Sequence, residues 1–452
     1  MNAVLLSLAV LFIISLFRIQ VVFALLVAAA VGGIAGGLSW ATTIETFTTG
    51  LADSATIAVS YALLGAFAAG LTETGLPSQL VNGARKLLGR STQDGSSRRT
   101  TIIVLMLLAV AFIASLSQNV VPIHIAFIPI LIPPMLVIWN EMRVDRRAVA
   151  SALTFGLIMP YMLIPAGFGA IFHDIVAKNM TQNGLAVDAS MLPQAMWIPA
   201  LGMFAGLLVA IGVSYRRPRS YTSTAAAAQT NAAAVDERDS SAAQLPGARW
   251  RTVAGIASIA AMLATQLATG SMIAGAGAGL GVLLLARLMT RQRAERVFTE
   301  GMRSMSYIGF VMMSAAGLAA VLRATGDIDA LVQTSVAYVG DSRAIAVILM
   351  LLIGLLVTMG IGSSFSTIPL IATVFVPLCM ELGFSPLATI SLIGTAAALG
   401  DAGSPASDST LGPTAGLNAD GQHDHIWDTC VPTFLHYNIP LLIFGFIAAM
   451  VL

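Results

Sequence analysis

The sequence has little charge and almost no cysteine. Charged residues make up 10% of the 452 residues, and the formal net charge is only +1. A soluble chain of this length carries roughly 25% charge, so the composition excludes a soluble globular protein. Basic side chains are not interleaved with aromatic ones, which argues against a nucleic-acid partner. Cys379 and Cys430 lie far apart and match no redox or metal spacing.

Apolar residues fill most of the chain instead. They account for 57% of it, and the mean hydropathy is +0.86, which indicates an integral membrane protein. No stretch has the composition of a soluble catalytic domain, so we do not expect an enzyme. We interpret residues 1–17 as the first membrane helix, because no basic segment precedes the apolar run. Helical spans of roughly 20 residues are predicted at 2–17, 20–40, 54–76, 148–168, 194–214, 252–269, 271–289, 304–323, 386–400 and 433–452.

The distribution of basic residues predicts how these spans are oriented. Twenty of the 23 Lys and Arg residues fall on one side of the membrane if the N-terminus is outside. This is the pattern of cytoplasmic loops. Residues 216–249 belong to that side, and their Ala-rich polar composition predicts a disordered cytoplasmic linker.

The linker separates two related halves, 1–215 and 250–452. Without gaps, Phe47–Val81 matches Phe298–Val332 at eleven of 35 positions. An odd number of crossings separates these segments, so we expect inverted repeats. Chance similarity between apolar helices is the alternative.

Each half contains a long apolar stretch interrupted by a polar tip, at about 101–139 and 343–382. Re-entrant hairpins have this pattern, because tip N–H groups and hydroxyls bind ions or carboxylates inside the membrane. Two ordinary helix pairs with polar turns are the alternative. The tip residues predicted to contact substrate or ion, with the histidine that follows the first tip, are Ser117, Gln118, Asn119, His124, Ser363, Ser364, Ser366 and Thr367.

The second half ends in an unusually polar segment, 394–438. Five of the 22 acidic residues and three of the five histidines fall there. Its Gly, Pro and Ser residues cannot continue an apolar helix, so the helix that begins near Ser385 should unwind near Gly400. Residues 156–170 of the first half, GLIMPYMLIPAGFGA, predict a corresponding discontinuous helix without an acid. Carboxylates beside unwound helices inside a membrane are functional by default.

The predicted site has two carboxylates. Asp401 or Asp408 would bind Na⁺ through oxygen ligands, carry a proton, or hold the amine of an amino acid. The sequence does not choose between Na⁺ and H⁺ as the coupling ion, and no other cofactor is expected. The hydroxyls expected to complete the site belong to Ser404, Ser409 and Thr410.

The segment GQHDHIWD follows the unwound helix. Its His and Asp residues suggest a metal site, but such a site needs ligands fixed on a rigid frame, so we expect no bound metal. A gate or polar cap is the preferred interpretation. Its proposed members are Asp420, His423, Asp424, His425 and Asn438.

The motifs GDAGSPASDST through LHYN, with QNVVPIHIAFIPI, closely resemble the Na⁺/H⁺ antiporter family of the ion transporter superfamily. The resemblance covers essentially the whole chain and is closest to a bacterial branch of proposed amino-acid transporters, with histidine as the proposed substrate. It implies two inverted repeats with re-entrant hairpins, a scaffold domain forming a homodimer, and an elevator-type transport domain in the inner membrane. It also implies that Ser404, Pro405, Ser407, Asp408 and Ser409 line the site.

Together these features predict an all-α secondary transporter for a small amino acid coupled to Na⁺ or H⁺. Plain Na⁺/H⁺ exchange without an organic substrate is the main alternative. A channel would not need paired broken helices, and a membrane enzyme would be supported only by the HDH segment.

Overall fold

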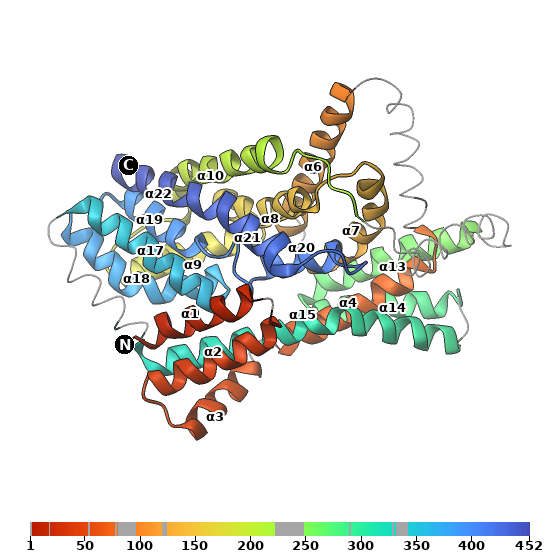
Figure 1. The fold of residues 1–452 in the computed structure, drawn as a ribbon, viewed down its shortest axis with the longest axis horizontal. Helices are drawn as coiled ribbons and strands as arrows, with labels where there is room; N and C mark the ends of the chain where they lie inside the picture. Colours follow the sequence, from red (N-terminus) through yellow and green to blue (C-terminus); the bar gives the residue numbers. More distant parts are fainter. Residues whose placement is uncertain are drawn as a thin grey trace.

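The computed structural model describes residues 2–17, 19–52, 55–76, 79, 96–119, 124–221, 248–288, 291–327, 330 and 342–452. Every regular element within these ranges is a helix, as predicted for an all-α membrane protein. The helices form two bundles, seen as a lower and an upper layer in Figure 1.

The lower layer, which we call the α15 bundle, joins helices from both halves of the chain. The long α15 packs along α2, α3 and α4, and α14 packs against α13 and α4. Its members are α1 (Ala3–Leu16), α2 (Val21–Ala35), α3 (Trp40–Leu51), α4 (Ala55–Thr72), α13 (Ala248–Thr269), α14 (Met272–Leu285) and α15 (Arg291–Thr325).

The upper layer, the α19 bundle, also joins helices from both halves. The first half supplies α6 (Ser96–Asn119), α7 (His124–Glu141), α8 (Arg146–Leu163), α9 (Phe168–Gln182), the short 3₁₀ helix η2 (Ala189–Met191), α10 (Leu192–Val209) and the π-helical turn η3 (Ala210–Ser214). The second half supplies α17 (Arg343–Ile361), α18 (Ser364–Glu381), α19 (Pro386–Ala398), α20 (Asp408–Leu417), η4 (His425–Cys430), α21 (Val431–Thr433), η5 (Phe434–Asn438) and α22 (Ile439–Val451).

Small residues hold the α15 bundle together. A Cβ atom at Gly301 of α15 would lie only 2.4 Å from the carbonyl oxygen of Gly65 in α4. The two backbones therefore approach more closely than any larger residue allows, which is typical of helix pairs in membranes. α4 and α15 carry the segments whose sequences match between the two halves, and they lie side by side.

Five described helices are long and apolar enough to cross a membrane, and the bent pair α8 and α9 makes a sixth if it counts as one span. Several other predicted spans are shorter helices, such as α14 with 14 residues and α19 with 13. The sequence prediction also missed α3, because its polar stretch TTIETFTTG does not have the composition of a membrane span.

Two helices are discontinuous, as predicted. α8 ends at Leu163, and α9 continues at Phe168 with a bend of 48°. α19 begins after its cap Ser385 and ends at Ala398, and α20 begins at Asp408. The break between them is held open by Gly and Pro residues, which cannot continue a helix.

The second interrupted stretch is a helix pair with a break at the predicted polar tip, where α17 and α18 meet at Gly362 and Ser363. In the first stretch the predicted tip residues 117–119 are the last residues of α6, and residues 120–123 before α7 lie outside the described residues. α6 has 24 residues and α17 has 19, which is enough for each to cross a bilayer alone. A re-entrant path for these pairs stays a prediction.

The linker predicted at 216–249 is ordered at both ends. Residues 216–221 pack against the α19 bundle, and α13 begins at Ala248, while 222–247 lie outside the described residues. The N–H of Arg219 donates to the carbonyl of Arg143, which fixes the start of the linker to the loop before α8.

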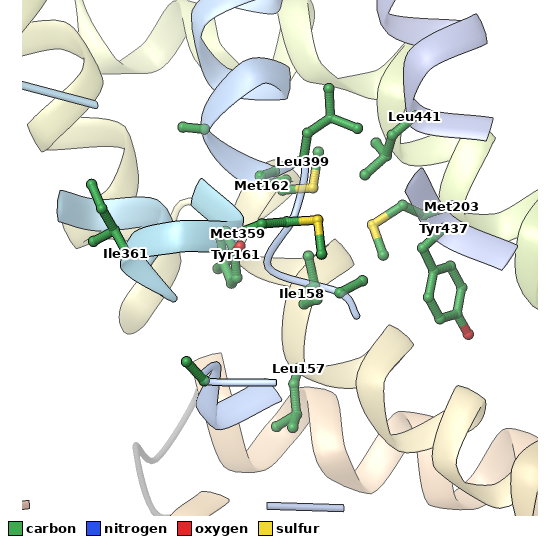
Figure 2. Packing of buried hydrophobic residues seen from close by; sticks show 14 of the residues in the cluster. Leu157, Ile158, Tyr161, Met162, Met203, Met359, Ile361, Leu399, Tyr437 and Leu441 are labelled. Carbon is green, nitrogen blue, oxygen red and sulfur yellow. The ribbon is translucent and has the colours of Figure 1, made fainter. Parts of the chain in front are cut away.

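An apolar core surrounds the breaks in the α19 bundle. Figure 2 shows part of it, with buried side chains from α8, α10, α17 and the last helices gathered around the end of α19. The labelled residues are Leu157, Ile158, Tyr161, Met162, Met203, Met359, Ile361, Leu399, Tyr437 and Leu441. This packing buries the unwound segment between α19 and α20.

Candidate functional site

Asp401 lies in the unwound segment 399–407 between α19 and α20. Its side chain is only 4% exposed, so a carboxylate sits inside the α19 bundle. Gly400 and Gly403, on either side of it, have φ of +86° and +93°, which glycine adopts without steric cost. The glycines turn the chain so that Asp401 faces inward rather than continuing the helix.

Four hydroxyl groups surround the Asp401 carboxylate. Tyr161 of α8 donates to Oδ2 at 2.8 Å and Ser364 of α18 donates to it at 3.1 Å. Ser407 donates to Oδ1 at 2.5 Å, and Ser409 approaches Oδ2 at 3.5 Å. We call these five residues the Asp401 cluster. It joins the broken helix α8/α9, the tip between α17 and α18, and the break between α19 and α20.

Two helix N-termini point toward this cluster. Ser364 is the first residue of α18, and Ser407 caps α20 by accepting from the N–H of Ser409 at 3.1 Å. The N-terminus of a helix carries partial positive charge, so this placement favours a negative group such as the Asp401 carboxylate or the carboxylate of a bound solute.

Side chains from both sides hold the unwound backbone in place. The amide of Asn438 accepts from the N–H of Gly400 at 3.0 Å and donates to the carbonyl of Ala402 at 2.6 Å. Thr410 donates to the carbonyl of Ser404 at 2.6 Å, and the Ser404 hydroxyl donates to the carbonyl of Met359 at 3.1 Å. Asn438, Ser404 and Thr410 therefore support the segment rather than touch Asp401.

Asp408 is the first residue of α20 and is partly buried. Its negative charge acts on Asp401 and on Tyr161. Like charges that act on one another favour a bound cation or a proton on one of the carboxylates.

The residues predicted at the two tips differ in their contacts, and some of their side chains lie outside the described residues. Ser363 precedes α18, and its carbonyl accepts from Thr367, whose hydroxyl lies 3.1 Å from that of Thr358. In the first tip, Ser117 donates to the carbonyl of Ala114 at 2.7 Å. The side chains of Asn119, His124 and Ser366 lie outside the described residues.

Gln118 is the first-tip residue with a free acceptor. Its side chain is buried at the end of α6, and among the described residues its Oε1 atom has no hydrogen-bond partner. A buried acceptor of this kind is usually satisfied, so Gln118 suits a ligand that brings an N–H group.

The HDH segment, residues 423–425, supports the unwound segment 399–407 through a chain of hydrogen bonds. Nε2 of His425 donates to the carbonyl of Pro405 at 2.9 Å, and its Nδ1 lies 2.8 Å from the Thr414 hydroxyl. The Thr414 hydroxyl donates to the Thr429 hydroxyl at 2.9 Å, and the Thr429 hydroxyl lies 2.7 Å from Nε2 of His423.

Burial lowers the pKa of His423 to about 3, against the raising effect of Asp428, so its ring is neutral. Across the described ranges, no three His, Cys, Asp or Glu side chains come together as metal ligands.

The remaining members of the proposed gate take part in polar contacts at one end of the α19 bundle. Asp420 forms an ion pair with Arg146 of α8, with contacts of 2.6 and 2.5 Å. Burial raises the pKa of Asp420, but the hydrogen bonds and charge of Arg146 outweigh burial and hold that pKa below its ordinary value. Asp424 caps η4 by accepting from the N–H of Trp427 at 2.7 Å.

The ordered start of the linker covers this end of the bundle. The guanidinium of Arg219 lies 2.8 Å from the carboxylate of Asp428. The hydroxyl of Tyr221 accepts from the backbone N–H of Arg146 at 2.8 Å, and the guanidinium of Arg146 lies over the Tyr221 ring at 4.2 Å. We call residues 215–221 the linker strap.

Sequence reasoning missed the contributions of the first half. It expected only a discontinuous helix without an acid at 156–170, whereas the structure supplies the phenol of Tyr161 to the site. A single polar ring in the otherwise apolar GLIMPYMLIP was the available signal. The sequence did not distinguish Arg146 as a buried residue, because it stands close to Arg143 and Arg147 at the start of α8.

The sequence is similar to known families of membrane proteins. Residues 152–446 match the model of the Na⁺/H⁺ antiporter family, and residues 2–88 match a second model described as a Na⁺-H⁺ antiporter family. An uncharacterized membrane protein of Vibrio parahaemolyticus is 51% identical over the full length of both chains. A Bacillus subtilis protein, provisionally named amino acid transporter YuiF, is 50% identical, again over 100% of both chains.

Two solved structures have a more distant likeness. MtrF of Neisseria gonorrhoeae, described as illuminating a class of antimetabolite efflux pumps, is 17% identical with a TM-score of 0.41, covering 90% of this chain and 84% of its own. YdaH of Alcanivorax borkumensis is 15% identical with a TM-score of 0.40, covering 90% of this chain and 87% of its own. These scores are too low to support an argument. The family match over most of the chain is sufficient: this multi-pass membrane protein is a transporter that belongs to the Na⁺/H⁺ antiporter family.

Proposed function

We propose that the protein moves a small amino acid, with histidine as the first candidate, across the bacterial inner membrane in a process coupled to Na⁺ or H⁺. The Asp401 cluster carries this proposal. It places one buried carboxylate among four hydroxyl oxygens drawn from three separate breaks in the helices. The name of the YuiF relative supports an amino acid as solute.

The cluster supplies the ligands that a small hard cation needs. Na⁺ is bound by oxygen atoms, and the carboxylate and hydroxyls of the cluster are all oxygen ligands. On binding Na⁺, the hydroxyls would turn their protons away from Asp401 and present lone pairs. A proton on Asp401 would serve the same coupling role, because it removes the negative charge that Asp408 opposes.

The amino-acid solute would use complementary groups of the same site. Its ammonium group would pair with Asp408, which lies beside the cluster but makes no part of it. Its carboxylate would face the N-terminus of α18 at Ser364, where backbone N–H groups favour an anion.

In the proposed transport cycle, the two bundles have separate roles. Residues 1–215 and 250–452 would be inverted repeats, each contributing a hairpin and a broken helix to the α19 bundle. The α15 bundle would be the scaffold and the contact surface of a homodimer. The α19 bundle would carry the site across the membrane as an elevator, with residues 216–249 on the cytoplasmic side. The mixed origin of both bundles supports this division.

Sodium/proton exchange without an organic solute is the second candidate. The family to which the chain belongs supports it. In that case Asp401 and Asp408 would alternate between Na⁺ and H⁺ alone.

The test uses purified protein in proteoliposomes. Radiolabelled histidine and a panel of other amino acids are offered with an inward Na⁺ gradient or an inward H⁺ gradient, imposed separately. Saturable accumulation that needs one gradient supports the proposal and names the ion. Asp401→Asn should abolish accumulation, whereas Asp174→Asn, on an exposed position of α9, should not. Sodium-driven proton movement without uptake of any amino acid would favour the second candidate.

A further inference from the structure

Four buried side chains form one continuous chain of hydrogen bonds near the end of the sequence. Nε2 of His423 lies 2.7 Å from the Thr429 hydroxyl, which lies 2.9 Å from the Thr414 hydroxyl. The Thr414 hydroxyl in turn lies 2.8 Å from Nδ1 of His425. None of the four side chains is more than 9% exposed. We call them the His–Thr chain.

The two ends of the His–Thr chain lie in different surroundings. At one end, Nε2 of His425 donates to the carbonyl of Pro405 at 2.9 Å, inside the unwound segment 399–407 that holds Asp401. At the other end, His423 lies in the loop between α20 and η4, where the linker strap reaches Asp428. The chain therefore runs from the end of the α19 bundle under the linker strap to the backbone beside Asp401.

Charged and titratable groups act mainly on the His423 end. Asp428 attracts a proton to His423, whereas two guanidinium groups and the second imidazole oppose it. Asp424 acts on His425, and the thiol of Cys430 lies 3.6 Å from its Nε2 atom. The opposing groups at His423 are Arg146 of α8, Arg219 of the linker strap and His425 of η4.

Every member of the chain can both donate and accept, so its protons have two consistent arrangements. A carbonyl oxygen only accepts, so Nε2 of His425 carries a proton in both. If His425 is neutral, its Nδ1 accepts from Thr414, Thr414 accepts from Thr429, and Thr429 accepts from Nε2 of His423. If both nitrogens of His425 are protonated, all three bonds reverse. The Thr414 hydroxyl donates to Thr429, which is the direction of the second arrangement.

The two arrangements differ by one proton that has crossed the chain. When a proton binds Nδ1 of His423, Nε2 of that ring releases its own proton to the Thr429 oxygen. Thr429 then releases its hydroxyl proton to Thr414, and Thr414 releases its own to Nδ1 of His425. Each N–H or O–H bond that breaks is replaced by one at the next atom, and both hydroxyls remain hydroxyls. The positive charge thus moves from His423 to His425.

We propose that the His–Thr chain is a proton path and that His425 carries the coupling proton of transport. This inference rests on the proposed function, and it chooses H⁺ as the coupling ion and His425 rather than Asp401 as its carrier. A protonated His425 makes a charge-assisted bond to the Pro405 carbonyl, roughly twice as strong as a neutral one. Proton binding therefore tightens the unwound segment, and a solute bound at Asp401 senses the proton.

The test compares Thr429→Val with Thr433→Val in the full-length protein. Both threonines are completely buried, but the Thr433 hydroxyl donates to the backbone carbonyls of Thr429 and Cys430, at 2.8 and 3.2 Å. Thr429→Val removes the middle of the path and leaves both histidines in place. In proteoliposomes with an inward H⁺ gradient, Thr429→Val should accumulate radiolabelled histidine at least tenfold more slowly than Thr433→Val. Both variants should bind histidine with the wild-type affinity at one fixed pH.

A second variant, His425→Gln, separates proton transfer from support of the backbone. The glutamine amide still offers an N–H to the Pro405 carbonyl but carries no additional proton. Accumulation driven by the H⁺ gradient should fall at least tenfold. Exchange of labelled for unlabelled histidine at equal pH should continue, because exchange needs no net proton movement. Loss of both activities in His425→Gln, with Thr429→Val equal to Thr433→Val, would leave His425 as a support for the backbone alone.

The remaining outcomes separate this inference from the proposed function. Equal accumulation by Thr429→Val and Thr433→Val under the H⁺ gradient would overturn the proton path. Wild-type accumulation that needs a Na⁺ gradient and ignores the H⁺ gradient would overturn His425 as the carrier, while the proposed function would stand. If the wild type takes up no amino acid, the proposed function fails and this inference fails with it.

Discussion

The ion pair between Arg146 and Asp420 should contribute strongly to stability, because Arg146 is completely buried. Its guanidinium is 0% exposed and bonds to both oxygens of Asp420, to the carbonyl of Leu417 at 2.9 Å and to Asn140 at 3.1 Å. Asp420→Asn removes the only negative charge among these partners. Breaking a buried pair costs about 3–5 kcal/mol. Since Asp420 itself is 15% exposed, we expect the lower end, about 3 kcal/mol.

The chain offers a second bidentate pair, with an exposed arginine, as a control. Arg293 of α15 bonds to Glu73 at 3.0 and 3.1 Å; the Glu73 side chain is 8% exposed, but the Arg293 side chain is 45% exposed. Glu73→Gln leaves a guanidinium that water still solvates, so it should cost only about 0–1 kcal/mol. Chemical unfolding in mixed micelles, followed by tryptophan fluorescence, measures both variants. A loss for Asp420→Asn no larger than that for Glu73→Gln would refute the reasoning from burial.

The same pair predicts a pH dependence with a definite sign. Arg146 holds the pKa of Asp420 below its ordinary value of about 4, so the pair stabilises the protein fully above that pH. The contribution is lost as the pH falls through the lowered folded-state pKa. The stability difference between wild type and Asp420→Asn should therefore be constant from pH 5 upward and shrink below pH 4. A difference that grows on acidification would contradict the assignment.

Two further substitutions test the support of the Asp401 cluster, and a third tests the linker strap. Gly403→Ala forces a residue with Cβ into φ +93° and within 2.5 Å of Phe434, so it should destabilise the fold by about 1–3 kcal/mol in the same unfolding assay; wild-type stability would disprove the strain. Asn438→Leu removes both hydrogen bonds to the unwound segment, and solute uptake should fall at least tenfold while the protein stays in the membrane fraction. Arg219→Ala frees the linker strap from Asp428, and protease cleavage near residue 219 should accelerate; an unchanged cleavage rate would show that the backbone bond to Arg143 and the Tyr221 hydroxyl hold the strap without the ion pair.

Local sequence predicted the breaks because Gly and Pro act within a few residues of where they stand. The unwound segment at 399–407 and the bend after Leu163 follow from that local chemistry, and so does the position of Asp401 inside the membrane protein. The expectation that the unwound segment carries the acid needed no tertiary information.

The partners of these groups could not be predicted in the same way. Tyr161 is 240 residues from Asp401, and Arg146 is 274 residues from Asp420. Apolar helices such as α4 and α10 have no polar face that indicates which neighbour each side contacts, so the sequence did not reveal two bundles of mixed origin. The HDH segment shows the same limit, since the contact of His425 with Pro405 depends on how the chain folds back.

The separation of Arg146 from Asp420 has a consequence for how the protein is made. Synthesis at roughly 5–20 residues per second needs about 14 to 55 s to add the 274 residues between them. During that time α8 holds a guanidinium whose carboxylate does not yet exist, and the 240 residues from Tyr161 to Asp401 take a slightly shorter time, about 12 to 48 s, at the same rate. The first half of the chain therefore reaches the membrane before the second half can complete either bundle.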